Sequence, residues 1–166
     1  MTSGAVTGPE LGAFIAAQFE AELQLFRAAL AAVPAEQFGV ARLGHSAAWH
    51  ALHIADWLRL TVLEDRTPDY HHLGWEDRDW VKTLDRAPAP LDETAGKDAI
   101  LARLDRMAGR AVAAIRAMTP ADLAGTTFAP SAPTGERPRL PSLGIHLRHI
   151  AYHRGQLRLV LKTLGG

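Results

Sequence analysis

Histidine is the residue whose number and spacing in this sequence point most directly to chemistry. The eight histidines form two tight groups with one adjacent pair between them, and residues 91–145 contain none: His45, His50, His53, His71, His72, His146, His149 and His153. Within the last group, His149 and His153 are four residues apart. On an α-helix this spacing places two side chains roughly 40° apart around the axis and roughly 6 Å apart along it. Two such imidazoles can reach one metal ion from one face of the helix.

A third ligand has to come from elsewhere in the chain, and the first group offers His53 and His50. Three neutral imidazoles that leave positions open for water or substrate would make a metal site of the catalytic type. The alternative is that these histidines are surface or hydrogen-bonded core residues, because pairs with this spacing also arise by chance. No glutamate follows His149, as one would in an HExxH motif, so the sequence disfavours a zinc-protease mechanism.

The composition excludes several classes of site and partner. The chain has no cysteine, so it has neither disulfides nor thiolate ligands nor a cysteine nucleophile, and any metal must be held by nitrogen and oxygen. The 18 basic and 18 acidic residues balance, and no basic run is present, so we expect neither nucleic acid nor a membrane as partner. Residues 1–8 lack the pattern of a signal peptide, which makes a cytoplasmic location the default expectation.

The elements that must position the histidines are helices. Apolar residues at three- and four-residue steps predict helices over 9–33, 46–64, 92–118 and 142–164, bounded by prolines and glycines, with Ser46 and Ser142 as N-caps. In the first helix this stripe consists of Leu11, Phe14, Ile15, Phe19, Leu23, Phe26 and Leu30. No segment alternates with a period of two, so we expect no sheet. The prediction is one all-α domain over residues 1–166, a four-helix bundle.

Two long connections separate the predicted helices. Residues 67–91 contain three prolines and two tryptophans, with a turn of helix expected around 76–84, and residues 125–141 are also rich in proline. Short turns are expected at 34–38 and 120–123. Loops this long tend to be functional or mobile, and they favour crossover connections over a simple up-and-down bundle.

Two motifs resemble a known family. The segment SAAWHALHIADW at residues 46–57 and the pattern HxxxHRGQ at residues 149–156 are similar to those of the DinB-like (YfiT-type) superfamily. The resemblance implies a four-helix bundle with crossed connectivity that forms homodimers. It also implies one divalent metal ion held by His53, His149 and His153. Three imidazoles suit several metals, and Zn or Ni is the first expectation.

The neighbours of these ligands have competing interpretations. His50 and His146 lie outside the family pattern and are predicted to support the ligands or to line the pocket. Gln156, which belongs to the HxxxHRGQ motif, is also predicted to support the ligands or to line the pocket, whereas Arg154 is interpreted as structural. Asp56 could hydrogen-bond a ligating histidine or lie on a solvated face. Three further sets complete the predictions: Trp49 and Trp57 as core anchors, His71 and His72 as a lid over the metal pocket, and no assigned catalytic residue.

The family resemblance indicates a fold and a metal more directly than a reaction. Similar proteins include S-transferases and isomerases that use mycothiol or bacillithiol, so our preferred hypothesis is a thiol-dependent S-transferase in stress or detoxification. The thiol would be a low-molecular-weight cofactor, acting on a small-molecule substrate after the metal lowers the pKa of the thiol. The alternatives are a metal-dependent hydrolase, with Asp56 or Glu64 as base, and a non-catalytic metal-binding stress-response protein.

Overall fold

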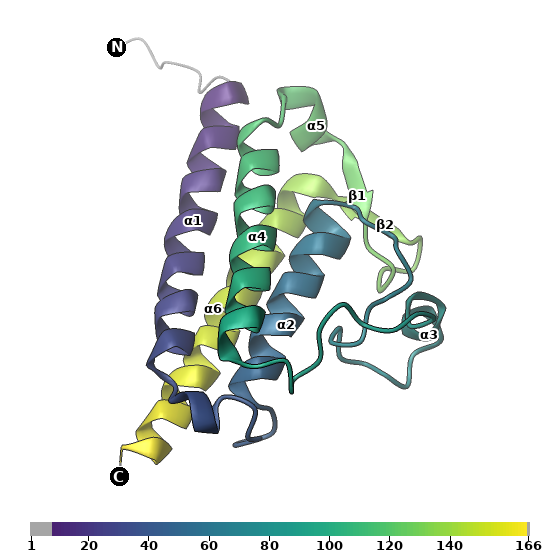
Figure 1. Ribbon diagram of the computed structural model, residues 1–166. Coiled ribbons are helices and arrows are strands. Elements are labelled where there is room, and N and C mark those ends of the chain that lie inside the picture. Colours follow the sequence, from purple (N-terminus) through teal and green to yellow (C-terminus); the bar gives the residue numbers. More distant parts are fainter. Residues whose placement is uncertain (1–7, 166) are drawn as a thin grey trace, which may run out of the picture.

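The computed structural model describes residues 8–165, so most of the segment on which the signal-peptide prediction rests lies outside the described residues. Four long helices form the molecule: α1 (Gly8–Ala32), α2 (Ala47–Trp57), α4 (Lys97–Arg116) and α6 (Arg139–Leu164). Figure 1 shows them side by side as one bundle, with the start of α1 and the end of α6 at opposite ends of it. The predicted four-helix bundle is therefore confirmed.

The connectivity of the bundle contains crossovers. α1 packs against α4 and α6, and α2 packs against the same two helices, so α1 and α2 lie on opposite corners. α1 and α6 run in one direction, and α2 and α4 run in the other (Figure 1). The first long connection therefore joins two parallel neighbours, α2 and α4, which requires the chain to cross from one end of the bundle to the other.

The core follows the apolar periodicity of the sequence. Its largest fully buried members include Phe19, Phe26, Leu30, Leu52, Ile100, Leu104 and Ile115. Phe14, which the periodicity assigned to the apolar stripe of the first helix, is instead 60% exposed. At the upper end of the bundle α1 approaches α4 closely, because a Cβ on Gly12 would lie 3.1 Å from the carbonyl oxygens of Ile115 and Met118. Glycine permits that contact.

α2 is buried on all sides, which explains why it carries so few charges. Every residue of Ala47–Trp57 is buried, and so are the five residues Leu58–Val62 that continue the helix as a π-helical turn, η2. π-turns are often found at functional sites. A hydroxyl cap begins the helix as predicted, since the Ser46 side chain accepts a hydrogen bond of 2.9 Å from the amide of Trp49.

The connection after η2 covers the outer side of α2. It contains α3 (Asp79–Leu84), close to the turn predicted at 76–84, and buries Tyr70 and Leu73 in a small second core with Trp57. The following helix, α4, begins at Lys97 rather than at the predicted Asp92. The reason is local: the Asp92 carboxylate accepts hydrogen bonds from the amide and hydroxyl of Thr94, which fixes a turn there.

The second connection contains strands, which the sequence did not predict. After α5 (Pro120–Ala124), β1 (Thr126–Phe128) pairs antiparallel with β2 (Glu136–Pro138) in a small hairpin. The expectation of no sheet is therefore wrong. α6 also begins three residues before the predicted cap, and within residues 8–165 the buried Ser142 hydroxyl has no hydrogen-bond partner.

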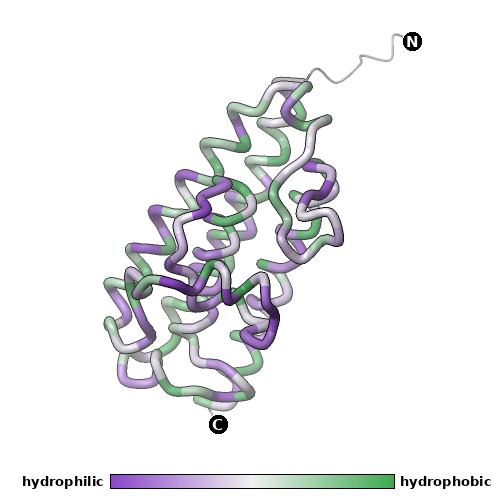
Figure 2. The backbone as a smooth tube through the Cα atoms, turned by 90° about the vertical axis from the view of Figure 1, so that its right-hand side faces the viewer, coloured by the Kyte–Doolittle hydropathy of each residue, from purple (hydrophilic) through white to green (hydrophobic). Residues whose placement is uncertain are grey.

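A short 3-10 turn, η1 (Ala35–Gln37), occupies the predicted turn at 34–38. Along the outer helices, hydrophobic and hydrophilic residues both occur within each turn (Figure 2), as expected for helices with one buried face. None of the helices within residues 8–165 combines the length and the apolar character needed to span a bilayer.

Candidate metal centre

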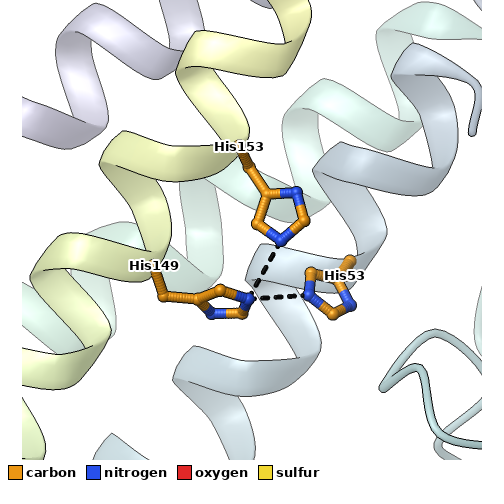
Figure 3. Close-up of side chains that lie close together, drawn as sticks. All are labelled: His53, His149 and His153. Atoms are coloured by element: carbon orange, nitrogen blue, oxygen red, sulfur yellow. Dashed lines mark hydrogen bonds between the residues drawn. The ribbon is translucent and has the colours of Figure 1, made fainter. Parts of the chain in front are cut away.

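Three histidines from two helices converge at the middle of the bundle. His53 comes from α2, and His149 and His153 come from successive turns of α6 (Figure 3). The Nε2 atom of His149 lies 3.0 Å from Nε2 of His53 and 2.9 Å from Nε2 of His153. One ligand nitrogen from each of the three residues falls within 4.8 Å of the others. The structure thus brings together the three residues predicted as ligands.

The tautomer of His53 is fixed by a backbone acceptor. Its Nδ1 atom lies 2.6 Å from the carbonyl oxygen of His72, and because a carbonyl only accepts, Nδ1 must carry the proton and donate it. In the neutral imidazole the Nε2 atom then presents a bare lone pair to the other two histidines. Such an outer hydrogen bond is the usual way in which proteins orient a metal-ligating histidine.

His153 has a comparable outer partner in His50. The two Nδ1 atoms are 2.9 Å apart, and His50 itself is buried on α2. When Nδ1 of His153 donates to His50, its Nε2 also turns a lone pair toward the cluster. His50 therefore orients a candidate ligand without being one itself. Of the two roles predicted for His50, supporting a ligand or lining the pocket, the structure places it in the first.

Stacking holds His53 in place from a third side. The indole of Trp49 lies between two imidazoles: its ring centroid is 4.3 Å from that of His53 and 3.6 Å from that of His45, with nearly parallel planes. Trp49 and Trp57 are both more than nine-tenths buried, as expected for core anchors, but both also line the cavity over the histidines. They act as walls of the site.

Burial keeps the cluster uncharged. Desolvation lowers the pKa of His149 and His146 to about 4 and that of His153 to about 3, and it lowers the pKa of His53 well below its usual value. Proximity of the imidazoles to one another adds to the effect, since each disfavours a charge on its neighbour. At neutral pH all of these rings are neutral, which is the form that binds metals.

The donor set fits a divalent metal ion. Four-coordinate zinc with bonds of about 2.0–2.1 Å places its ligand nitrogens roughly 3.4 Å apart, within about half an ångström of the two Nε2 separations here. The lone pair of His53 also needs a proton or a cation opposite it. Two Nε2 atoms, those of His53 and His153, lie within 3.0 Å of Nε2 of His149, which can donate at most one proton. One proton cannot satisfy both lone pairs, whereas a metal ion between the three nitrogens can.

The histidines open into a cavity of about 790 Å³. Its wall is largely aromatic and includes residues from both long connections: His45, Trp49, Trp57, Leu73, Gly74, Trp75, Glu76, Ser131, Arg137, His146, Arg148, Tyr152 and Gln156. A volume of this size accommodates a small organic molecule. His146 and Gln156 lie in the wall as predicted, and the Gln156 amide donates a 3.0 Å hydrogen bond to the Tyr152 hydroxyl.

Asp56 takes neither of the positions considered for it. Its carboxylate is 4% exposed and faces two buried guanidinium groups, those of Arg103 at 3.5 Å and Arg59 at 4.0 Å. The nearest imidazole paired with it is that of His72, at 3.9 Å. Burial raises the pKa of Asp56 to about 6, although both arginines oppose that shift. Asp56 is therefore a buried counter-ion between Arg59 and Arg103 rather than a partner of a candidate ligand.

Contrary to the expectation from the sequence, the side chains of His71 and His72 do not cover the metal pocket. His71 points away, since its ring pairs with Asp85 at 2.5 Å and its Nε2 donates to the Ala87 carbonyl. The His72 imidazole faces Asp56, and only its backbone reaches the site. The neighbouring loop residues Leu73 to Glu76 line the cavity instead. Arg154 is structural as interpreted, because it pairs with Glu22 of α1.

Sequence reasoning missed the loop residues of the wall. Arg137 and Ser131 come from the hairpin region, and Trp75 and Gly74 from the first long connection. Gly74 and Trp75 both have positive φ, 71° and 57°. For Gly74 the sequence contains one signal, which is that the residue is a glycine within a long loop. For Arg137 it contains none, because the position of Arg137 in the sequence has no regular spacing relative to the histidines.

Comparison with known proteins agrees with this architecture. No curated protein matches the chain in sequence. Among solved structures, the chain is similar to YfiT from Bacillus subtilis, a probable metal-dependent hydrolase with an unusual four-helix bundle topology. The TM-score is 0.62 at 17% identity, over 99% of this chain and 93% of that one. The family model of the DinB superfamily matches residues 18–157, so this chain belongs to the DinB superfamily.

Proposed function

We propose that the protein binds one divalent metal ion through Nε2 of His53, His149 and His153 and acts on a small molecule in the adjoining cavity. The convergence of the three neutral imidazoles on one point carries this proposal. The resemblance to YfiT, itself described as metal-dependent, supports it. Zn and Ni are the first candidates, since both accept imidazole ligands.

The reaction that we propose is thiol-dependent S-transfer, with mycothiol or bacillithiol as the type of co-substrate. A divalent ion held at the cluster would lower the pKa of a thiol in the cavity, so that the thiolate is available at neutral pH. The chain has no cysteine, so the sulfur has to enter with the co-substrate. The sulfur bonds to an electrophilic carbon, the leaving group departs with its electron pair, and the thiol proton passes to solvent.

The positions of the two carboxylates that the sequence offered as a hydrolytic base favour S-transfer over hydrolysis. A hydrolase would benefit from a carboxylate base beside the metal. Neither Asp56 nor Glu64 lines the cavity: Asp56 faces arginines, and Glu64 accepts hydrogen bonds from Thr127 and from the amide of Phe128. A thiol that is acidified by a metal needs no such base.

Hydrolysis of a small ester or amide is the second candidate. Glu76 is the one carboxylate among the described residues that line the cavity, and it could serve as a base for water. YfiT is described as a probable hydrolase. A non-catalytic metal-binding protein of the stress response is the third. Homodimer formation, a cytoplasmic location and the absence of a nucleic-acid partner stay predictions of the sequence.

Turnover with and without thiol separates these candidates. Metal-loaded protein would be mixed with 1-chloro-2,4-dinitrobenzene and one thiol at a time: mycothiol, bacillithiol, cysteine or glutathione. The arylated thiol would be measured by its absorbance. A parallel series with 4-nitrophenyl acetate and no thiol would report hydrolysis. We expect thiol-dependent product that is lost in His149→Ala. Product from the ester alone would favour the hydrolase, and no turnover in either series would favour the non-catalytic protein.

A further inference from the structure

A second hollow adjoins the cavity over the histidines. It has a volume of about 400 Å³ and is lined by Trp75, Arg78, Trp80, Ser131 and Arg137. Three of these residues, Trp75, Ser131 and Arg137, also line the histidine cavity. The two hollows therefore share a wall, and the histidine cluster lines the larger of them but not the smaller.

The charges around these two hollows are mostly positive. Arg78, Arg137 and Arg148 line one or other of the two hollows, and Glu76 is the one carboxylate that the described part of the chain places there. Within residues 8–165, Arg137 has neither an ion pair nor a side-chain hydrogen bond, although it is half-buried. Its charge reaches the cavity, since it helps to lower the pKa of the buried His146. A half-buried guanidinium without a partner is suited to bind an anion.

The wall beside Arg137 is aromatic and held in an unfavourable backbone conformation. Trp75 has a φ of 57°, a left-handed conformation that bulky residues rarely adopt, and its side chain remains 54% exposed. Its ring meets Trp57 and Trp80 edge to face, with centroids 6.2 and 5.9 Å apart. Strain that keeps a large apolar ring at an open surface is typical of ligand-binding sites.

We propose that Arg137 and Trp75 form an anion subsite for an elongated ligand with an aromatic or otherwise apolar body. Its carboxylate pairs with Arg137, its body lies against Trp75, and its other end reaches the three histidines. The proposal deepens the proposed function, on which it rests for the identity of this ligand as substrate or co-substrate. The subsite itself requires no metal.

A pair of probes that differ in charge alone tests the subsite. 1-Naphthaleneacetate and 1-naphthaleneacetamide have the same ring and nearly the same size, so calorimetric titration of both separates charge recognition from apolar contact. The titrations would use the wild type, Arg137→Gln, Arg137→Lys and a matched control, Arg158→Gln, which removes an exposed arginine that lines neither hollow. Circular dichroism would confirm that each variant is folded.

We expect the wild type to bind the acid more tightly than the amide. Arg137→Gln should weaken the acid about tenfold, because a charge-assisted hydrogen bond is lost, and should leave the amide within about twofold. Arg137→Lys should retain part of the preference, and Arg158→Gln should match the wild type. Equal affinity for acid and amide in the wild type, or an equal effect of Arg137→Gln on both, would overturn the subsite.

Repeating the titrations in metal-free His149→Ala separates the two proposals. If the preference for the acid persists in His149→Ala but the wild type itself neither binds metal nor shows turnover, the subsite stands and the proposed function falls. If metal binding and turnover hold but Arg137→Gln leaves the preference for the acid unchanged, the subsite falls and the proposed function stands.

Discussion

His53 donates a hydrogen bond from Nδ1 to the backbone carbonyl of His72, 2.6 Å away, and so ties the candidate ligand of α2 to the loop that covers it. The same loop continues through Leu73, Gly74 and Trp75 into the cavity wall. The orientation of the ligand and the shape of the pocket therefore depend on one segment. Changes to that segment should alter metal affinity without replacing a ligand.

Gly74 offers a direct test of this dependence. Its φ of 71° is left-handed, so Gly74→Ala should destabilise the protein by about 1 kcal/mol and shift the loop, which weakens the hydrogen bond to His53. We expect metal affinity to fall as well. Gly96→Ala is the matched control, with a φ of 86° at the start of α4 and no atom within 4 Å of its added Cβ.

The two glycine variants would be compared by urea unfolding and by competition with a chromophoric chelator. Both should lose stability, and only Gly74→Ala should lose metal affinity. Equal affinities in the two variants would show that the loop does not position His53.

His50 should matter through His153. Removing the Nδ1 partner of a ligating histidine typically costs 10- to 100-fold in metal affinity, so His50→Leu should bind metal that much more weakly while one ion per chain is still bound at saturation. His50→Asn keeps a polar atom near the position of Nδ1 and should recover most of the loss. If chelator competition gives the same affinity for His50→Leu as for the wild type, the contact has no orienting effect.

Asp56 should be worth far more to stability than an exposed carboxylate. Asp56→Ala leaves Arg59 and Arg103 in the interior without this counter-ion, which costs about 3–5 kcal/mol for a buried pair. Asp105→Ala breaks the exposed pair with Arg27 and should cost at most about 1 kcal/mol. Urea unfolding measures both. Similar losses in the two variants would contradict the assignment of Asp56 as a buried counter-ion of Arg59 and Arg103.

Lowering the pH should destabilise the metal-free protein. The pKa of His146 is lowered to about 4 in the folded state, so protons bind the unfolded chain preferentially once the pH falls below 6.5, and stability is lost down to about pH 4. The other buried imidazoles act in the same direction. Asp56 acts in the opposite direction, since its pKa is raised to about 6, but it is one group against several.

Unfolding free energies at pH 7 and pH 5 would check the sign. We expect a lower value at pH 5, and a smaller difference in His146→Leu, which has one buried imidazole fewer. An equal or higher stability at pH 5 would contradict the assignment of neutral buried histidines.

The fold was largely predictable from the sequence because its helices are long and periodic. The hairpin was not, because strands as short as Thr126–Phe128 are too brief to show an alternation of period two. The start of α4 was misplaced because the side chains of Asp92 and Thr94 form a turn that competes with the helix.

The site was predictable only where helical geometry or family resemblance applied. His149 and His153 share one face of one helix, so their spacing suffices, and His53 followed from the resemblance to the DinB-like pattern. The pairing of His50 with His153 depends on how α2 packs against α6, which sequence spacing does not determine. Arg137 and Trp75 reach the cavity through the paths of two long loops, for which no periodicity exists.

Metal content is the most direct test of the central claim. Elemental analysis would be made on untagged wild-type protein and on His149→Ala, both as purified and after incubation with Zn or Ni followed by gel filtration. Leu159→Ala, an exposed position on the same helix that does not line the cavity, serves as the matched control. We predict about one divalent ion per chain in the wild type and in Leu159→Ala, and none in His149→Ala. No metal in the wild type after incubation, or equal metal in His149→Ala, would contradict a metal centre at His53, His149 and His153.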